Sequence, residues 1–143
     1  MVNKKFNLYN NINSNNCNNT PVISITTYDN VDTNQCTILE ENINKSGVYI
    51  LVNKIKGKSY IGSSIYLSNR FGNYYYLTSL TLQVKGYIII YRALLKYGYK
   101  NFSLDILEYC EPDVLIKREQ YYIKIIKLEY NILKVNDNNL GSY

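Results

Sequence analysis

Residues 47–62 read GVYILVNKIKGKSYIG, and this stretch decides the fold of the chain. Two apolar runs, at about residues 47–52 and 58–62, flank a short basic segment that contains Gly57. Runs of this length on either side of a Gly-containing loop are typical of a β-hairpin. Tyr49 and Tyr60 stand at matching places on the two predicted strands. The stretch therefore predicts a hairpin with a tyrosine on each strand.

The sequence after the hairpin predicts an α+β domain. Helices are expected at about residues 64–76, 87–97 and 114–127, the first capped by Ser63 or Ser64. Around residues 102–106 apolar and polar side chains alternate, which predicts a half-buried strand. This order of elements suggests a small three-stranded antiparallel sheet flanked by helices.

The two ends of the chain differ from the middle. Residues 1–20 are rich in Asn and poor in apolar side chains, so we expect a disordered tail. Residues 21–45 form a leader segment, with a short extended piece near its start and a short helix at about 32–42. The expected domain is 46–135, followed by a polar C-terminal tail at 136–143. A chain of 143 residues suffices for one modest domain.

Charge is divided along the chain. Residues 1–45 hold three basic and four acidic side chains, a net of −1, whereas residues 46–143 hold 13 and 7, a net of +6. A basic domain is expected of a polyanion binder, although a basic solvated surface is the plainer alternative. Lys54, Lys56 and Lys58 in the hairpin loop either contact a DNA backbone or form a solvated turn. No run reaches the length of a membrane span, so no membrane partner is expected.

Histidine is absent and the three cysteines are widely spaced. Zinc sites are built from closely spaced Cys and His ligands, so this composition excludes the usual zinc patterns. It also excludes a histidine general base. The 17 tyrosines and the wealth of Asn, Ile and Lys match A/T-rich codons, and so fit an A/T-rich genome such as that of a fungal mitochondrion.

Glu119 is the carboxylate that the helical pattern singles out. Leu115, Glu119, Tyr122 and Ile126 follow one another at steps of four, three and four, and therefore share one helix face. A carboxylate on an apolar stripe is costly unless it is paired or binds a metal. Two interpretations remain open: a Glu at the edge of the stripe that pairs with a cation or reaches solvent, and a metal ligand.

Arg70 is the basic residue that the helical pattern singles out. Tyr66 and Tyr74 lie four residues to either side, so the three side chains share a face of the predicted helix. A guanidinium can fork to two phosphate oxygens and stabilise the charge of a transition state. The alternative is a surface arginine stacked on a tyrosine.

Together these residues resemble the GIY-YIG nuclease family, whose name spells the two hairpin tripeptides; the first reads Gly-Val-Tyr here. The resemblance covers roughly residues 21–140 and is closest to the subgroup encoded by mobile group I introns of fungal mitochondria. It implies an endonuclease that cuts double-stranded DNA in the mitochondrion. The target sequence and the oligomeric state are left open.

The resemblance also implies roles for individual residues. Glu119 would hold a single Mg²⁺, a hard cation that prefers oxygen ligands, and Arg70 would stabilise the transition state. Tyr60 would orient or deprotonate the attacking water with the help of Tyr49, because without histidine a phenol must serve.

Three further residues would support the site. Gly62 would give the backbone freedom to turn close to the phosphate. Tyr74 would lie near the phosphate, and Asn131 would brace the site by hydrogen bonds or act only as a turn residue. Ser63 stands where some repair-type relatives have Lys, which leaves one phosphate contact in doubt.

Two rival functions stay open. The chain could be a catalytically idle, DNA-binding relic of an intron reading frame, since it carries no recognisable DNA-recognition module after the domain. It could also be a structure-specific repair nuclease, with the same chemistry and another substrate. The sequence retains the residues that the family's chemistry implies, which favours an active enzyme: Tyr49, Tyr60, Arg70, Glu119 and Asn131.

Overall fold

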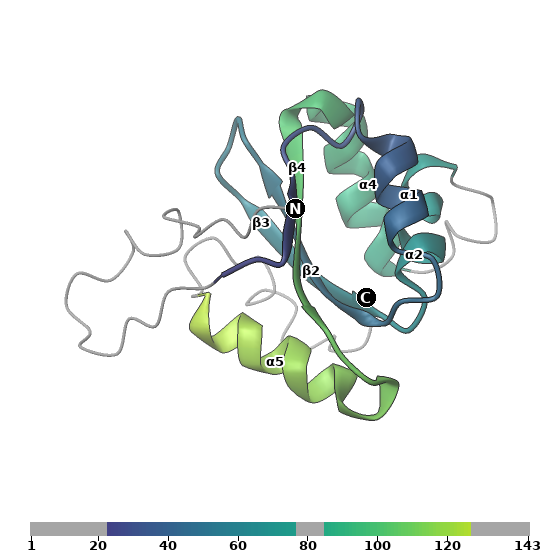
Figure 1. Ribbon diagram of the computed structural model, residues 1–143. Helices are drawn as coiled ribbons and strands as arrows, with labels where there is room; N and C mark the ends of the chain where they lie inside the picture. The colour runs from purple at the N-terminus through teal and green to yellow at the C-terminus, as the bar shows by residue number, and fades with distance from the viewer. Residues whose placement is uncertain (1–22, 77–84, 127–143) are drawn as a thin grey trace.

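The centre of the fold is an antiparallel sheet of four strands in the order β1-β4-β2-β3 (Figure 1). The computed structural model describes residues 23–76 and 85–126, without the side chains of residues 85–88. The strands are β1 (Thr26–Tyr28), β2 (Gly47–Asn53), β3 (Ser59–Ser64) and β4 (Phe102–Tyr109). The predicted hairpin is β2–β3, so the edge strand β3 carries the second tripeptide.

The expected α+β class is confirmed, but the sheet has four strands where we expected three. The leader supplies the additional strand, since β1 pairs with β4 from Thr26↔Ile106 to Tyr28↔Leu104. Three residues are too few for a period-two pattern to be read from sequence.

Because of β1, strand β4 lies in the interior of the sheet, and the expectation of a half-buried strand was wrong. Asp105 is fully buried and Ser103 is 8% exposed. An interior strand with helical layers on both sides of the sheet has no solvent-facing row of side chains, so polar residues there are buried with the apolar ones.

Helices cover both faces of the sheet (Figure 1). On one face lie α1 (Gln35–Glu41), α2 (Leu67–Tyr75) and α4 (Lys85–Tyr97), and on the other lies α5 (Leu115–Ile125). Short 3₁₀ turns, η2 (Tyr99–Asn101) and η3 (Pro112–Val114), flank β4. The predicted helices are present, and their ends differ from the predicted ones by at most three residues. α2 begins at Leu67 without a side-chain cap, and Ser64 Oγ instead accepts a hydrogen bond from the Tyr66 amide.

Alternation along β2 divides the core into two clusters. Tyr49 and Leu51 face α1, α2 and α4, whereas Val48, Ile50 and Val52 face α5. Successive strand residues point to opposite faces, so β2, which has helices on both sides, is apolar at every position from Val48 to Val52. None of the described helices has the length and apolar character needed to cross a membrane.

The leader packs into the larger cluster. Tyr28, Val31 and Ile38 are between 0% and 4% exposed within it. The leader also holds α2, since Ser68 Oγ donates to the Leu39 carbonyl at 2.8 Å and the Tyr75 hydroxyl donates to the Val31 carbonyl. The helix that carries Arg70 therefore rests on the leader. The expected disordered tail, residues 1–20, and the expected C-terminal tail, residues 136–143, lie outside the described residues.

Candidate active site

The two tripeptides lie side by side in the hairpin, and the phenol of Tyr49 crosses over Gly62. Tyr49 is the register partner of Gly62, and Leu51 that of Tyr60. A Cβ atom at Gly62 would lie 2.5 Å from Tyr49 Oη and 2.7 Å from Cζ. The role of Gly62 differs from the expected one, because it lies within β3 and is not among the positive-φ glycines of the described residues. Gly62 leaves room for the tyrosine ring.

A close contact also explains why the first tripeptide begins with a glycine, Gly47. A Cβ atom at Gly47 would lie 2.3 Å from the carbonyl oxygen of Glu108 on β4. Next to it the β2–β4 register shifts, since Val48 pairs with Glu108 but Tyr49 with Ile106. The extra residue in this register is Leu107, so the bulge belongs to β4 and bends that strand. It lies opposite the step from Val48 to Tyr49.

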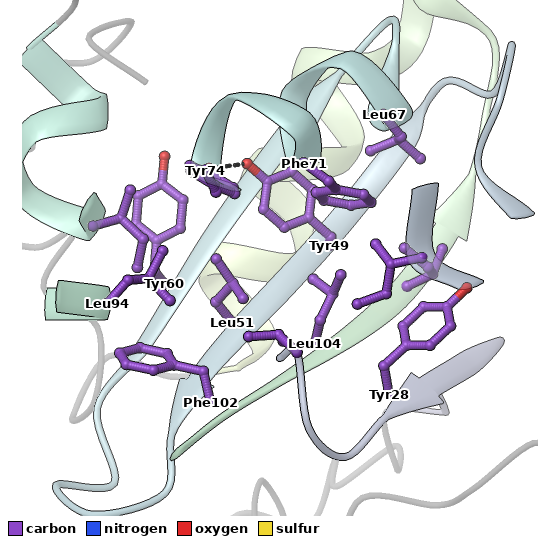
Figure 2. Packing of buried hydrophobic residues seen from close by; sticks show 14 residues of the cluster. Tyr28, Tyr49, Leu51, Tyr60, Leu67, Phe71, Tyr74, Leu94, Phe102 and Leu104 are labelled. Carbon is purple, nitrogen blue, oxygen red and sulfur yellow. Dashed lines mark hydrogen bonds between the residues drawn. The ribbon is translucent and has the colours of Figure 1, made fainter. Parts of the chain in front are cut away.

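Three phenols form the inner layer of the site. Tyr49 Oη and Tyr74 Oη are 2.5 Å apart and share a hydrogen bond (Figure 2). The rings of Tyr49 and Tyr60 have centroids 6.5 Å apart, and Phe71 packs edge-on against Tyr49 at 4.9 Å. The three tyrosines are at most 6% exposed. Burial, with the neighbouring tyrosines adding to it and Arg70 opposing it, raises the pKa of Tyr74, so this phenol stays neutral at physiological pH.

Arg70 lies at the outer side of this layer. Its Nη1 donates to Tyr49 Oη at 3.4 Å, and its amide donates to the Tyr66 carbonyl at 3.0 Å in the first turn of α2. The side chain is half-buried. The same tyrosine hydroxyl therefore meets both Tyr74 and the guanidinium, which couples the orientation of Arg70 to the buried hairpin.

Glu119 approaches from the other face of the sheet. It lies on α5, which contacts β3 and β2, and the hydroxyl of Ser63 on β3 donates to its carboxylate. Burial raises the pKa of Glu119, while the Ser63 hydrogen bond and the charge of Arg70 oppose this rise. Arg70 and Glu119 thus sit on helices of opposite layers and interact across the edge strand β3.

A bidentate ion pair that the sequence did not reveal anchors α5 beside Glu119. Arg118 Nε and Nη2 donate to the two oxygens of Glu108 at 2.8 Å each, and the Tyr122 hydroxyl donates to Oε1 at 3.0 Å. The guanidinium also lies 4.4 Å from the centroid of the Tyr121 ring. A fork of this kind fixes the rotation of the helix and hence the direction of the neighbouring Glu119. No spacing signals it, because Glu108 belongs to another element.

The residues present fit a hard divalent cation with few protein ligands. Within residues 23–76 and 85–126 no group of three or more His, Cys, Asp or Glu side chains could hold a metal. One half-buried carboxylate, Glu119, remains at the site beside a hydroxyl. Mg²⁺ commonly takes one or two carboxylates and completes its shell with phosphate and water.

Other predicted residues do not gather at this site. Lys54 Nζ donates to the Asp29 carbonyl of the leader at 2.6 Å. Lys56 and Lys58 are exposed at the far end of the hairpin, and Lys58 precedes Ser63 by five residues, about 16 Å along the strand. Asn131 lies outside the described residues.

The comparisons with known proteins agree with the hairpin motif. The family described as GIY-YIG catalytic domain matches residues 45–137. The chain is 33% identical over 112 residues to the Neurospora crassa protein named "Probable intron-encoded endonuclease bI1", an alignment that covers 73% of this chain and 24% of that protein. The chain thus spans about a quarter of this curated relative. The catalytic domain of homing endonuclease I-TevI is similar at 27% identity and a TM-score of 0.45, over 62% of this chain and 98% of that one.

Proposed function

Because this chain belongs to the GIY-YIG catalytic domain family, we propose that it is an intron-encoded homing endonuclease that hydrolyses phosphodiester bonds of double-stranded DNA with Mg²⁺. The observation that carries the proposal is the meeting of Arg70 and Glu119 around β3, beside the hairpin tyrosines. A cation and a carboxylate are the two charged groups that phosphodiester hydrolysis requires of a site of this kind.

Arg70 binds the scissile phosphate and stabilises the negative charge that grows on it. A half-buried guanidinium acts in a lower dielectric than one in open water, so its effect on a developing charge is larger. Tyr49 accepts a hydrogen bond from Arg70 and, being fully buried, holds the guanidinium in one direction. Tyr74 in turn fixes the hydroxyl of Tyr49.

Tyr60 is the residue to which we assign the positioning of the attacking water. It lies beside Tyr49 on the neighbouring strand, with only 6% of its surface exposed. A phenol with an ordinary pKa near 10 is a weak base, so orientation contributes more here than deprotonation unless a nearby positive charge stabilises the phenolate. Separate Tyr49→Phe and Tyr60→Phe variants distinguish the two tyrosines.

Glu119 would hold the metal, with Ser63 orienting its carboxylate. The bound cation would supply Lewis-acid stabilisation of the phosphate and of the leaving oxygen. Glu119 itself contributes a negative charge that attracts the cation to the edge of β3. With one such site among the described residues, each encounter would yield one nick.

The substrate and the compartment have independent support. The +6 charge of residues 46–143 favours binding to a polyanion, and Lys56 and Lys58 extend the basic surface along the hairpin. The fungal relative is named an intron-encoded endonuclease, and the A/T-rich composition fits a mitochondrial gene. These two observations support our proposal that the protein acts in the mitochondrion.

Incubation of the purified chain with supercoiled plasmid and Mg²⁺ tests the proposal. The wild type is expected to convert plasmid to the open circular form, and both Glu119→Gln and Arg70→Ala are expected to lose this activity by several orders of magnitude. Arg70→Ala should also weaken DNA binding, whereas Glu119→Gln should not.

The plasmid assay, together with cleavage assays on flap and bubble substrates, distinguishes the rival functions. An idle relic would bind plasmid without nicking it under any divalent metal. A structure-specific repair nuclease would cut flap or bubble substrates and leave an intact duplex of the same sequence uncut. Nicking that persists in Glu119→Gln would contradict the assignment of Glu119.

A further inference from the structure

A cleft of about 490 Å³ opens at the end of the sheet where β3 passes into α2. The residues that bear on its chemistry are Asn44, Lys45, Ile65, Tyr66, Tyr109 and Glu111. They come from the leader, from the β3–α2 connection and from the end of β4. A volume of this size is in the range of small-molecule sites and suits one nucleotide. None of the catalytic residues discussed above lines it.

Two consecutive apolar side chains project from the β3–α2 connection. Tyr66 is 60% exposed and Ile65 is 48% exposed. Both line the cleft. A single exposed apolar residue needs no explanation, but an aromatic ring at the mouth of a cleft in a basic domain offers a stacking surface for a base.

The polar groups of the cleft suit the edge of a base better than a phosphate. The ammonium of Lys45 lies 4.7 Å from the centroid of the Tyr109 ring, and Glu111 stands in the same lining. A carboxylate repels phosphate but accepts hydrogen bonds from the amino groups of bases, and an asparagine such as Asn44 can both donate and accept. The mixed charge therefore favours a base inside the cleft and its phosphate outside.

The cleft is close to the proposed cleavage site. Tyr49 pairs with Gly62, and two positions further along the hairpin Gly47 pairs with Ser64, next to Ile65. Two strand residues span about 7 Å, and one DNA strand rises about 3.4 Å per phosphate. The Tyr66 carbonyl also accepts the amide of Arg70, one helical turn away. The cleft is thus within about two nucleotides of a phosphate held by Arg70.

We propose that this cleft binds one unstacked nucleotide of the DNA strand, adjacent to the phosphate at Arg70, with its base stacked on Tyr66. The inference rests on the proposed function for its choice of ligand. It adds that the enzyme engages an unpaired base beside the cut. Such a contact favours substrates in which that base is already free, because unstacking a paired base costs a few kcal/mol.

A binding experiment without metal tests the cleft independently of cleavage. The full chain is titrated, in the presence of EDTA, into a single-stranded oligonucleotide with one central 2-aminopurine and into the matching duplex. The Tyr66→Ala variant is expected to bind the single strand about 5- to 100-fold more weakly, as for the loss of one base stack, with a smaller effect on the duplex. Tyr66→Phe keeps the ring and should bind as the wild type does.

Tyr76→Ala is the matched control. Tyr76 is 65% exposed and follows the other end of α2, ten residues from Tyr66, where it accepts a hydrogen bond from Gln35. Equal losses in Tyr66→Ala and Tyr76→Ala, or equal losses on single strand and duplex, would overturn the proposal. Plasmid nicking is measured on the same samples. If plasmid is not nicked but binding still depends on Tyr66, the proposed nuclease activity is rejected and the proposed nucleotide site is retained. If plasmid is nicked but binding does not depend on Tyr66, only the proposed nucleotide site is rejected.

Discussion

The hydroxyl oxygen of Tyr49 lies 2.5 Å from the position that a Cβ atom at Gly62 would occupy. The packing of the two tripeptides therefore excludes a side chain at Gly62. This contact joins the motif glycine to the catalytic arginine we propose, because the same hydroxyl accepts the hydrogen bond from Arg70. The motif is thus one packing unit, in which the glycine admits the ring and the ring directs the guanidinium.

Replacing Gly62 by alanine should therefore damage both stability and activity. The added methyl group must displace Tyr49 or the strand, and overpacking of this kind costs about 1–3 kcal/mol. Gly72→Ala is the control, since its Cβ would meet only Leu39 Cδ2 at 3.9 Å and alanine favours the helix by about 0.5–1 kcal/mol. Urea unfolding and plasmid nicking measure both effects. A Gly62→Ala protein as stable as Gly72→Ala would contradict the steric account.

The hairpin could be predicted from sequence because its apolar runs and turn are local features. The shared face of Leu115 and of Ile126, the residue that follows α5, was predicted for the same reason, and both residues are buried against the sheet. The strand β1 could not be predicted, since its three residues become a strand only by pairing with β4. The bidentate contact between Arg118 and Glu108 is likewise set by the packing of α5 on the sheet.

The motif could propose residues for the site, but not the layer of the fold from which each one approaches it. The motif pointed to Tyr49, Tyr60, Arg70 and Glu119, yet no pattern shows that Glu119 reaches Arg70 from the opposite side of the sheet. The hairpin loop with its three lysines shows a second kind of feature that the sequence does not predict. Its charge is plain in the sequence, but the contact of Lys54 with Asp29 depends on how the leader folds back.

The leader should be needed for folding while the preceding tail is not. A chain that starts at residue 45 keeps the whole family match but loses Tyr28, Val31 and Ile38 from the core. Loss of several buried apolar side chains exceeds the stability of a small domain. We expect this chain to be unfolded by circular dichroism. A chain that starts at residue 21 should melt within a few degrees of the full protein, and a larger drop would contradict the expected disorder of residues 1–20.

Alkaline pH should unfold the protein cooperatively. Burial raises the pKa of Tyr99 and of Tyr122 from 10.0 to about 12, and burial likewise raises the pKa of Tyr74. The folded state thus holds these protons more tightly than the unfolded state. The resulting stability is fully present below pH 10 and is lost as pH rises through about 12. The tyrosinate absorbance of the buried phenols should rise together with the loss of ellipticity, whereas exposed phenols such as Tyr66 can ionise in the folded state. Ionisation of all the tyrosines near pH 10 without loss of ellipticity would contradict the burial.

The two outward lysines of the hairpin should contribute to DNA binding in a salt-dependent way. Lys56→Ala with Lys58→Ala is expected to reduce the slope of log K against log salt by about 2, if each lysine neutralises one phosphate. Lys54→Ala should affect the slope less, because its ammonium already binds the Asp29 carbonyl. Fluorescence anisotropy at several salt concentrations measures the slopes. Identical slopes in the double variant and the wild type would assign these lysines to a solvated turn.

The Glu119→Gln variant should distinguish the effect of the Glu119 charge on folding stability from its effect on metal binding. In metal-free protein the carboxylate is half-buried on the apolar face of α5, and the neutral amide retains an oxygen that can accept the Ser63 hydrogen bond. The variant should therefore be at least as stable as the wild type without metal. Addition of Mg²⁺ should raise the melting temperature of the wild type and leave that of Glu119→Gln unchanged, because a ligand stabilises only the state that binds it. Differential scanning calorimetry with and without Mg²⁺ tests this without reference to activity. A variant that unfolds in the absence of metal, combined with a wild type that Mg²⁺ does not stabilise, would make Glu119 a structural partner of Arg70 and Ser63.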